Sequence, residues 1–328
     1  MILIFSEEFD ASTNIVLSWL LYYDVKSERV NRISASNEVY SFYYNNSKRS
    51  SNLNFRKKTN NYTIDDIKTV WYRRRPDLIN NISINKNKRL EKDIVENITN
   101  ECYAIYISYA GKFDNIPSLG NPRLENISKT YQLNHAIKHK LPIPPTIITN
   151  NKNNLLAFKK RYKKIIIKPI QNLPHHFIQG KVYAPYTTIL SKKTITHLNN
   201  NFHPCLAQKY IDKDFEVRSF YLDGKFFSMA IFSQSDKQTQ FDFRNYNETH
   251  PSRRVPYKLP EYVEKKLKSF MVDLGLNSGS IDIIVNKKGR HIFLEVNPCG
   301  QFGMVSYPCN YYLEHEIAKY LIKNHEKK

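Results

Sequence analysis

The pattern of hydrophobic and polar positions predicts a strand and a helix at the start of the chain. Residues 1–5 (MILIF) are uniformly apolar and predict a strand; residues 10–14 then offer helix caps before the amphipathic run VLSWLLYY. The Asn-rich residues 45–61 predict a loop or an irregular insert. TVWYRRRP predicts another strand that stops at its proline, and its arginines, 73–75, either line a cleft or face solvent.

The segment LENISKTYQLNHAIKHKLP predicts a helix. Ser128 is a suitable N-cap, the apolar residues that follow repeat at helical spacing, and Pro142 stops the helix. The next apolar stretch, KKIIIKPI (163–170), has the β-branched density of a buried strand. Alternation puts Lys168 on the face opposite Ile165 and Ile167, where a buried ammonium needs a phosphate or carboxylate partner unless it snorkels to the surface.

The sequence LAQKYIDKDFEVRSFYLDGKFFSMAIF predicts a strand, an acidic loop and then a hairpin with a tight turn at Asp223-Gly224. Glu216 and Arg218 are two residues apart, so they project from one face of their strand. The tail from about residue 311 to 324 has apolar residues along one side and predicts an amphipathic helix.

A further hairpin, SIDIIV–NKKGR–HIFLEVNP, places polar side chains among isoleucines. An even-length turn centred on residues 288–289 would put Asp282 directly opposite Glu295. Strict alternation would put Phe293 and Asn297 on the face of Glu295. Two carboxylates this close destabilise each other unless something neutralises them.

A divalent cation would neutralise the pair. Asp282, Glu295 and Asn297 offer only oxygen donors, which Mg²⁺ prefers, and they are too few for a closed cage, so phosphates would complete the coordination. The alternative is a surface hairpin with two solvated acids, which the flanking Ile and Phe residues disfavour. Cys299 follows without an evident partner base and is interpreted as a small packed residue.

The overall composition restricts the classes of protein to which this chain could belong. The formal net charge of +20, from 50 basic and 30 acidic residues, indicates either a polyanionic partner or a compositional bias toward lysine and asparagine, and both interpretations stay open. No apolar run approaches the ~20 residues of a membrane span. The N-terminus lacks signal-peptide features and the four cysteines show no CxxC spacing, so a cytoplasmic location is predicted.

These motifs together resemble the ATP-grasp carboxylate–amine ligases. The resemblance implies an α/β (α+β) protein with the ATP-grasp fold and with ATP in the cleft between its lobes. An N-terminal α/β domain would span residues 1–118, a small central lobe residues 119–207, and a C-terminal lobe with the metal site residues 208–328.

The resemblance also implies ATP and Mg²⁺ as cofactors and a role for each site residue. The residues so assigned are Lys129 and Lys168 at the nucleotide phosphates, Gln208, Tyr210 and Ile211 around adenine, Glu216 near the ribose, Arg218 reaching the phosphates, and Asp282, Glu295 and Asn297 as metal ligands. Relatives have a glycine-rich loop after the second lysine, whereas the loop after Lys168 is glycine-poor, with Gly180 as the candidate pivot.

A narrower resemblance is to the graspetide synthetases, in particular the microviridin-like and grasp-with-spasm maturases, through VWYRRRP, FDFRNYN and EVNPCGQF. It implies that ATP phosphorylates Asp or Glu side chains of a ribosomal precursor peptide. Ser, Thr or Lys side chains of the same peptide then displace the phosphate from the acyl phosphate and close ester or amide rings. Asp242 and Arg244 would contact this peptide, and relatives suggest a homodimer.

Two other functions compete with peptide cyclisation. An ATP-grasp ligase that adds an amino acid to a protein or small-molecule carboxylate would share every nucleotide-binding residue. A basic nucleic-acid-binding protein would explain the charge, but the sequence has no RNP-like or helix-turn-helix pattern, so neither a nucleic-acid nor a membrane partner is expected.

Overall fold

The computed structural model describes most of the chain. The described residues are 1–31, 38–45, 50–57, 60–76, 88–171, 176–178, 181–183, 187–235, 249 and 251–326. They form two compact units, Met1–Glu125 with Tyr312–Lys328, and Asn126–Tyr311. The three-part domain division expected from the sequence stays a prediction. No helix in the described ranges is both long and apolar enough to cross a lipid bilayer.

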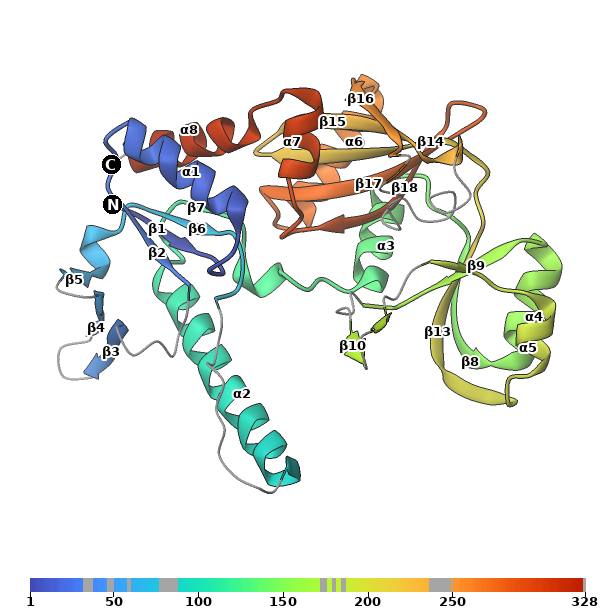
Figure 1. The fold of residues 1–328 in the computed structure, drawn as a ribbon, viewed down its shortest axis with the longest axis horizontal. Helices are drawn as coiled ribbons and strands as arrows, with labels where there is room; N and C mark the ends of the chain where they lie inside the picture. Colours follow the sequence, from blue (N-terminus) through green and yellow to red (C-terminus); the bar gives the residue numbers. More distant parts are fainter. Residues whose placement is uncertain are drawn as a thin grey trace. The chain divides into compact units, whose positions relative to one another are not determined.

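The first unit is built around a four-stranded parallel sheet in the order β2-β1-β6-β7 (Figure 1). Its elements are β1 (Ile2–Phe5), α1 (Ala11–Tyr22), β2 (Ser27–Val30), β3 (Glu38–Asn45), β4 (Ser50–Lys57), β5 (Asn60–Thr63), a 3-10 turn (Ile64–Asp66), β6 (Thr69–Tyr72), α2 (Lys88–Lys112), β7 (Ser118–Leu119), a 3-10 turn (Pro122–Leu124) and α8 (Leu313–His325). Aromatic residues of α2 pack on one face of the sheet, and α1 and α8 pack against each other.

Local sequence signals explain both helices that the sequence predicted here. The Asp10 side chain accepts a hydrogen bond from the backbone N–H of Thr13 at 3.0 Å, which satisfies one of the free donors at the start of α1. In α8, Leu313, Ile317 and Leu321 are fully buried at helical spacing. The predicted N-terminal strand, first helix and C-terminal helix are therefore confirmed.

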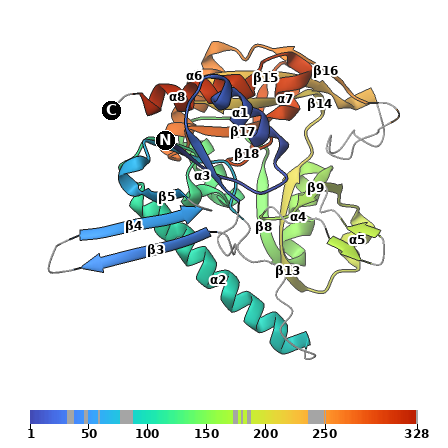
Figure 2. The ribbon, with the colours of Figure 1, turned by 60° about the vertical axis from the view of Figure 1, so that its left-hand side comes forward.

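The predicted loop at residues 45–61 is wrong. Strands β3, β4 and β5 form an antiparallel sheet there, with β3 paired to β4 along all eight residues (Figure 2). Asn and Ser are poor strand formers, which concealed the strands, but Leu53 and Phe55 preserve a period-two pattern between the polar residues.

The second unit contains two larger sheets and the β10–β11 hairpin. Its elements are α3 (Lys129–Lys138), β8 (Thr146–Asn151), α4 (Lys152–Tyr162), β9 (Ile165–Lys168), β10 (His176–Ile178), β11 (Lys181–Tyr183), β12 (Thr188–Ile189), α5 (Lys192–Thr196), β13 (Asn201–Lys209), β14 (Lys213–Leu222), β15 (Lys225–Phe232), a 3-10 turn (Ser233–Ser235), β16 (Arg253–Tyr257), α6 (Glu261–Asp273), β17 (Ser278–Asn286), β18 (His291–Asn297) and α7 (Gly303–Cys309). The sheet orders are β12-β9-β13-β8 and β16-β15-β14-β17-β18.

Two sequence signals account for local structure in this unit. Ser128 caps α3 by accepting from the backbone N–H of Tyr131, as predicted. The Asp223-Gly224 turn joins β14 to β15 directly, because Leu222 and Lys225 are register partners. Both turn residues have positive φ, 44° and 92°, which is the backbone that a two-residue hairpin favours.

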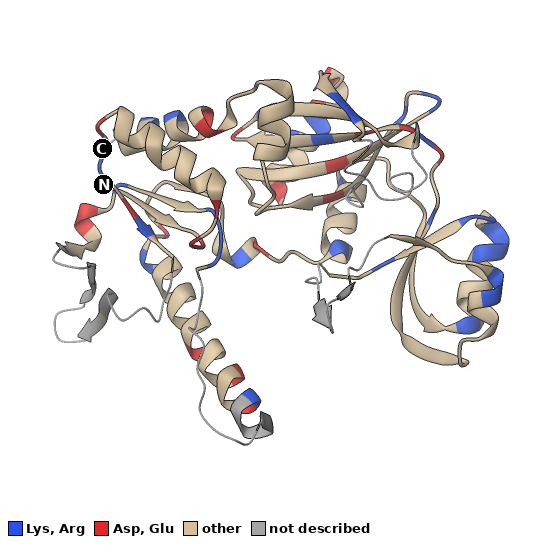
Figure 3. Cartoon of the chain, viewed as in Figure 1, with Lys and Arg blue, Asp and Glu red and all other residues tan. Residues whose placement is uncertain are grey.

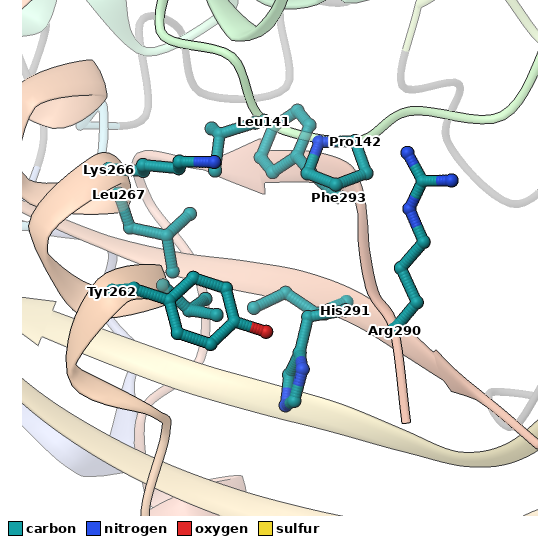
Figure 4. A pocket seen from close by; sticks show the side chains of 10 residues that line it. Leu141, Pro142, Tyr262, Lys266, Leu267, Arg290, His291 and Phe293 are labelled. Carbon is teal, nitrogen blue, oxygen red and sulfur yellow. The ribbon is translucent and has the colours of Figure 1, made fainter. Parts of the chain in front are cut away.

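The five-stranded sheet has an apolar face covered by α6. The Phe270 ring of α6 meets the Phe293 ring of β18 edge-on, with centroids 4.9 Å apart. On this same face a cavity of about 90 Å³ lies between α6, the Leu141-Pro142 segment and the start of β18 (Figure 4). Because Ile283 lines the cavity, its neighbour on β17, Asp282, projects from the opposite face of the sheet.

Truncation of Phe270 tests this packing. Phe270→Ala should lower the free energy of unfolding by about 3–5 kcal/mol, because the ring is fully buried and its removal leaves a void against Phe293. Val272→Ala, on the exposed side of the same helix, should change it by less than about 0.5 kcal/mol. Urea unfolding followed by circular dichroism measures both, and equal effects would contradict the packing described.

Candidate functional site

Three adjacent strands place the predicted charged residues in one row. Arg218 on β14 is the register partner of Asp282 on β17, and Asp282 is the register partner of Glu295 on β18. Partners across neighbouring strands share one face of a sheet, so the three charged side chains lie next to one another. The predicted opposition of Asp282 and Glu295 is confirmed.

The route to that opposition differs from the prediction. Near the turn, Val285 pairs with His291. The connection between these partners is one residue shorter than in the predicted even-length turn centred on residues 288–289. The register then shifts at a β-bulge, where β18 has one extra residue opposite the step from Ile283 to Asp282. The extra residue compensates for the shorter turn, so Asp282 pairs with Glu295 as predicted. The predicted even-length turn is therefore wrong.

The bulge also changes which side chains of β18 share a face. Phe293 packs against Phe270 on the α6 side, so it does not lie on the face of Glu295, and this part of the prediction is wrong. Strict alternation fails because the extra residue of a bulge reverses the inside–outside order of the residues beyond it. As a result β18 can bury Phe293 in the core and still present Glu295 to the opposite face.

Each carboxylate has a basic partner. The Lys129 ammonium, on the first residue of α3, lies 3.3 Å from Glu295 Oε2, and it also donates to the Pro169 carbonyl at 3.2 Å. Arg218 Nη1 lies 3.4 Å from Asp282 Oδ1. The neutralisation that the sequence argument assigned to a divalent cation is thus supplied here by two side chains, so the acid pair by itself does not require a metal.

The third predicted metal ligand is at the end of β18. Asn297 Oδ1 accepts from the Cys299 backbone N–H at 3.1 Å, and the Asn297 carbonyl accepts from the Gly300 N–H at 3.1 Å. A Cβ at Gly300 would lie 2.4 Å from the Ser280 side chain, so only glycine fits this turn. Asn297 and Ser280 are register partners, which puts Asn297 on the face of Asp282.

Strands β9 and β13 carry the residues predicted around the nucleotide. Ile165 and Ile167 pack in the core beneath α4, so Lys168, one position further along β9, lies on the other face as predicted. On β13, Gln208 is buried, its Nε2 donates to Thr146 Oγ1 at 3.0 Å, and its Oε1 has no hydrogen-bond partner among the described residues.

The segment between β13 and β14 carries two further predicted residues. Tyr210 is half-buried, and the Lys164 ammonium lies 3.7 Å from the centre of its ring. Burial raises the pKa of the Tyr210 hydroxyl, with smaller contributions from Asp212 and Glu216. Ile211 is half-exposed in the connection to β14.

Glu216 is part of a buried ion pair. Its Oε1 lies 2.7 Å from Lys213 Nζ, and its Oε2 accepts from Ser233 Oγ at 2.9 Å. Burial raises the pKa of the Glu216 carboxyl, and Lys213 and Ser233 offset only part of that effect. The predicted contact of Glu216 with the ribose stays a prediction.

Several predicted features lie outside the described residues. These are Asp242 and Arg244, together with Gly180 and most of the loop after Lys168. The described ranges contain no cluster of three or more His, Cys, Asp or Glu residues that could hold a metal ion. The predicted metal set of two carboxylates and one carboxamide stays a prediction.

Two residues that support the site were not predicted from the sequence. Gln132 is buried, accepts from the Val296 N–H through Oε1 at 2.8 Å, and donates to the Ile127 carbonyl at 3.1 Å. It lies three residues after Lys129 on α3, a spacing that was available as a signal. Lys213 lies three residues before Glu216, and only the structure shows that both are buried.

Comparison with known proteins identifies a domain family that matches this chain. Residues 134–297, half of the chain, match the domain family described as "Prokaryotic glutathione synthetase, ATP-grasp domain". This span contains every predicted site residue except Lys129. No curated protein gives a match to the sequence.

Solved structures share the fold over nearly the whole chain. A RiPP-associated ATP-grasp ligase of Chryseobacterium gregarium, in complex with ADP and a leader and core peptide, is 22% identical with a TM-score of 0.85, covering 98% of this chain and 96% of that one. The macrocyclase MdnC of Microcystis aeruginosa, bound to precursor peptide MdnA, is 24% identical with a TM-score of 0.79. The match covers 98% of this chain and 99% of MdnC. The ATP-grasp ligase PsnB, in complex with a minimal precursor, Mg and ADP, is 15% identical with a TM-score of 0.72. The match covers 99% of this chain and 97% of PsnB.

Removal of Lys213 tests the buried pair. Lys213→Met should lower the free energy of unfolding at pH 7 by about 3–5 kcal/mol, because it leaves the Glu216 carboxylate buried without its cation. The loss should shrink as the pH falls: burial holds the pKa of Glu216 above its unfolded value, so the folded state takes up a proton first and is stabilised in acid. Unfolding curves measured from pH 7 to pH 5 test this, and a loss that grows toward acid would contradict it.

Proposed function

Because this chain belongs to the ATP-grasp ligase family, we propose that it is an ATP-dependent carboxylate–alcohol or carboxylate–amine ligase that closes macrocycles in a ribosomally made precursor peptide. The observation that carries the proposal is the row of Arg218, Asp282 and Glu295 with Lys129 beside it, which combines two hard oxygen ligands with two cations. ATP supplies the free energy, and ADP and phosphate are released.

The donor chemistry fits magnesium. Asp282, Glu295 and Asn297 come from paired strands, share one sheet face and offer oxygen atoms only, which suits a hard cation that keeps phosphates or water in its remaining positions. Magnesium bound there would offset negative charge on the nucleotide phosphates. Lys129 and Arg218, which now pair with the two carboxylates, would then be available to the phosphate oxygens.

The chemical step needs activation of a carboxylate. Attack on a free carboxylate is slow because it adds negative charge to an anion, whereas an acyl phosphate has a good leaving group. Lys129, Lys168 and Arg218 would offset the charge that develops during phosphoryl transfer. Gln208 Oε1, buried and without a protein partner among the described residues, provides an acceptor for the adenine amino group.

The peptide substrate is supported by likeness of fold along nearly the whole chain. The similar ligase of Chryseobacterium gregarium and MdnC were both solved with peptides bound. Within this proposal Arg244 forms a bidentate pair with the substrate carboxylate, and Asp242 takes the proton of the attacking hydroxyl or ammonium group or orients Arg244. The cores of such peptides would contain acidic residues together with Ser, Thr or Lys.

A ligase that joins an amino acid to a protein or small-molecule carboxylate is the second candidate. The matching domain family is named for glutathione synthetase, which favours a small substrate. Both candidates use the same nucleotide residues and differ in what enters the acceptor site. A cytoplasmic location and a homodimer belong to the first proposal, and light scattering of the purified protein tests the dimer.

Co-expression separates the two candidates. The chain is produced together with a small Ser/Thr- and Asp/Glu-rich peptide encoded beside its gene, and the peptide is then weighed by mass spectrometry. Loss of one water per ring supports macrocyclisation, and hydroxylamine treatment distinguishes esters from amides. A mass gain equal to an amino-acid residue supports the second candidate instead.

Variants of the predicted metal ligands test the site. Glu295→Gln and Asn297→Ala should each reduce ATP-dependent modification at least about 100-fold, because each weakens the binding of the phosphate-bound cation. Glu261→Gln and Asn153→Ala make the same substitutions at two exposed residues, so they serve as matched controls and should retain activity. Circular dichroism checks that all four variants fold. Full activity of both site variants would remove the metal assignment.

A further inference from the structure

Acidic residues are absent from one long segment of the chain. Residues 126–211 contain 14 lysines and arginines and not one Asp or Glu, whereas the other 242 residues contain 36 basic and 30 acidic residues. This segment therefore carries a charge of +14 out of the total of +20. It comprises α3 and the sheet β12-β9-β13-β8 with its helices α4 and α5.

A general bias toward lysine does not explain this segment. Such a bias would enrich lysine along the whole chain, but it would leave carboxylates in place, as it does elsewhere. A surface of one charge sign also repels itself and lowers stability. A segment of 86 consecutive residues without Asp or Glu is instead expected where the protein attracts a polyanionic partner.

The exposed cations gather where α4 meets α5. The Lys159 ammonium donates to the Leu190 carbonyl at 2.8 Å, just before α5, and Lys152 donates to the Thr196 and Leu198 carbonyls at 2.8 Å. These bonds fix α5 alongside α4. The end of α4 and the start of α5 then expose cations, here called the basic face: Lys160, Arg161, Lys163, Lys192 and Lys193 (Figure 3).

Local structure accounts for only some of these charges. Cations in the last turn of α4 interact favourably with the helix dipole. Lys192, however, is the first residue of α5, where a positive charge is unfavourable. No carboxylate of the described residues pairs with any member of the basic face, whereas Lys258, Lys265 and Lys287 each lie within 3.3 Å of a carboxylate oxygen.

The nucleotide site does not explain the basic face either. Helices α4 and α5 pack on Ile165, so they cover the face of the small sheet opposite Lys168. The charges of the basic face are therefore directed away from the residues proposed to bind ATP. A second anionic partner is needed to explain them.

We infer that the basic face binds an acidic segment of the precursor peptide outside the residues that are cyclised. The inference rests on the proposed function. Side chains of Asp and Glu in a flexible segment can reach several cations at once, and the summed field also speeds encounter. Such a contact would hold the peptide by one part while another part reacts at the ATP site.

A peptide fits this face better than a nucleic acid. Binding of single strands relies on aromatic rings on which bases stack. The Tyr162 ring beside the basic face is half-buried, packs on Phe158 with centroids 4.8 Å apart, and already has the Arg161 guanidinium over it at 5.3 Å. The described part of the face therefore offers cations and no open stacking platform.

Neutralisation of the face provides the test. The variant Lys160→Gln/Arg161→Gln/Lys163→Gln is compared with Lys258→Gln/Lys265→Gln/Lys287→Gln, which removes three exposed cations outside the acid-free segment. Binding of a fluorescent peptide with six consecutive glutamates is measured by anisotropy at several salt concentrations, without nucleotide. The face variant should bind about tenfold more weakly and with a smaller salt dependence, and the control should lose less than about twofold.

Turnover of the encoded precursor peptide completes the test. For the face variant KM should rise about tenfold, while kcat and the affinity for an ATP analogue stay unchanged. Unchanged KM in an active variant would overturn the inference and leave the proposed function intact. Binding of the glutamate peptide by a protein that modifies no peptide would overturn the proposed function and leave only the acidic-peptide site on the basic face. Preference for a single-stranded oligonucleotide over the glutamate peptide would also overturn the inference.

Discussion

Two carboxylates held opposite each other on adjacent strands are the constraint on which the rest of the site depends. Asp282 and Glu295 are register partners, so their repulsion must be compensated in every state of the molecule. Arg218 compensates one from the neighbouring strand, and Lys129 compensates the other from the start of α3. The hairpin, the adjacent strand and the helix are thereby linked through charge.

The charged residues that meet at the site could be predicted from the sequence, whereas the strand geometry that brings them together could be predicted only in part. Two carboxylates and a carboxamide within apolar strands already indicate oxygen ligands. The pairing of Asp282 with Glu295 was predicted correctly from an incorrect turn, because the shorter turn and the β-bulge shift the register by equal and opposite amounts. Period-two reasoning cannot locate a bulge, so it placed Phe293 on the wrong face.

Other differences have equally specific causes. The strands within residues 38–63 were hidden because Asn and Ser have low strand propensity, although the apolar residues still alternate. The buried pair of Lys213 and Glu216 was missed because charged residues are rarely buried, and sequence spacing alone does not show burial. Helix caps within residues 10–14 and at Ser128 were predicted correctly because the signal is local to one turn, and the structure identifies the first cap as Asp10.

Gln132 joins these observations into one mechanical unit. Its Oε1 accepts from the backbone of Val296, the residue directly after Glu295, and its Nε2 donates to the Ile127 carbonyl just before α3. The helix that carries Lys129 is therefore tied to the strand that carries Glu295 by a neutral, buried bond as well as by the ion pair. Under the proposed function, a phosphate that competed with Glu295 for the Lys129 ammonium would break only the ionic link. The neutral bond would keep the lysine within reach of both partners, so the proposed exchange between carboxylate and phosphate would need no displacement of the helix.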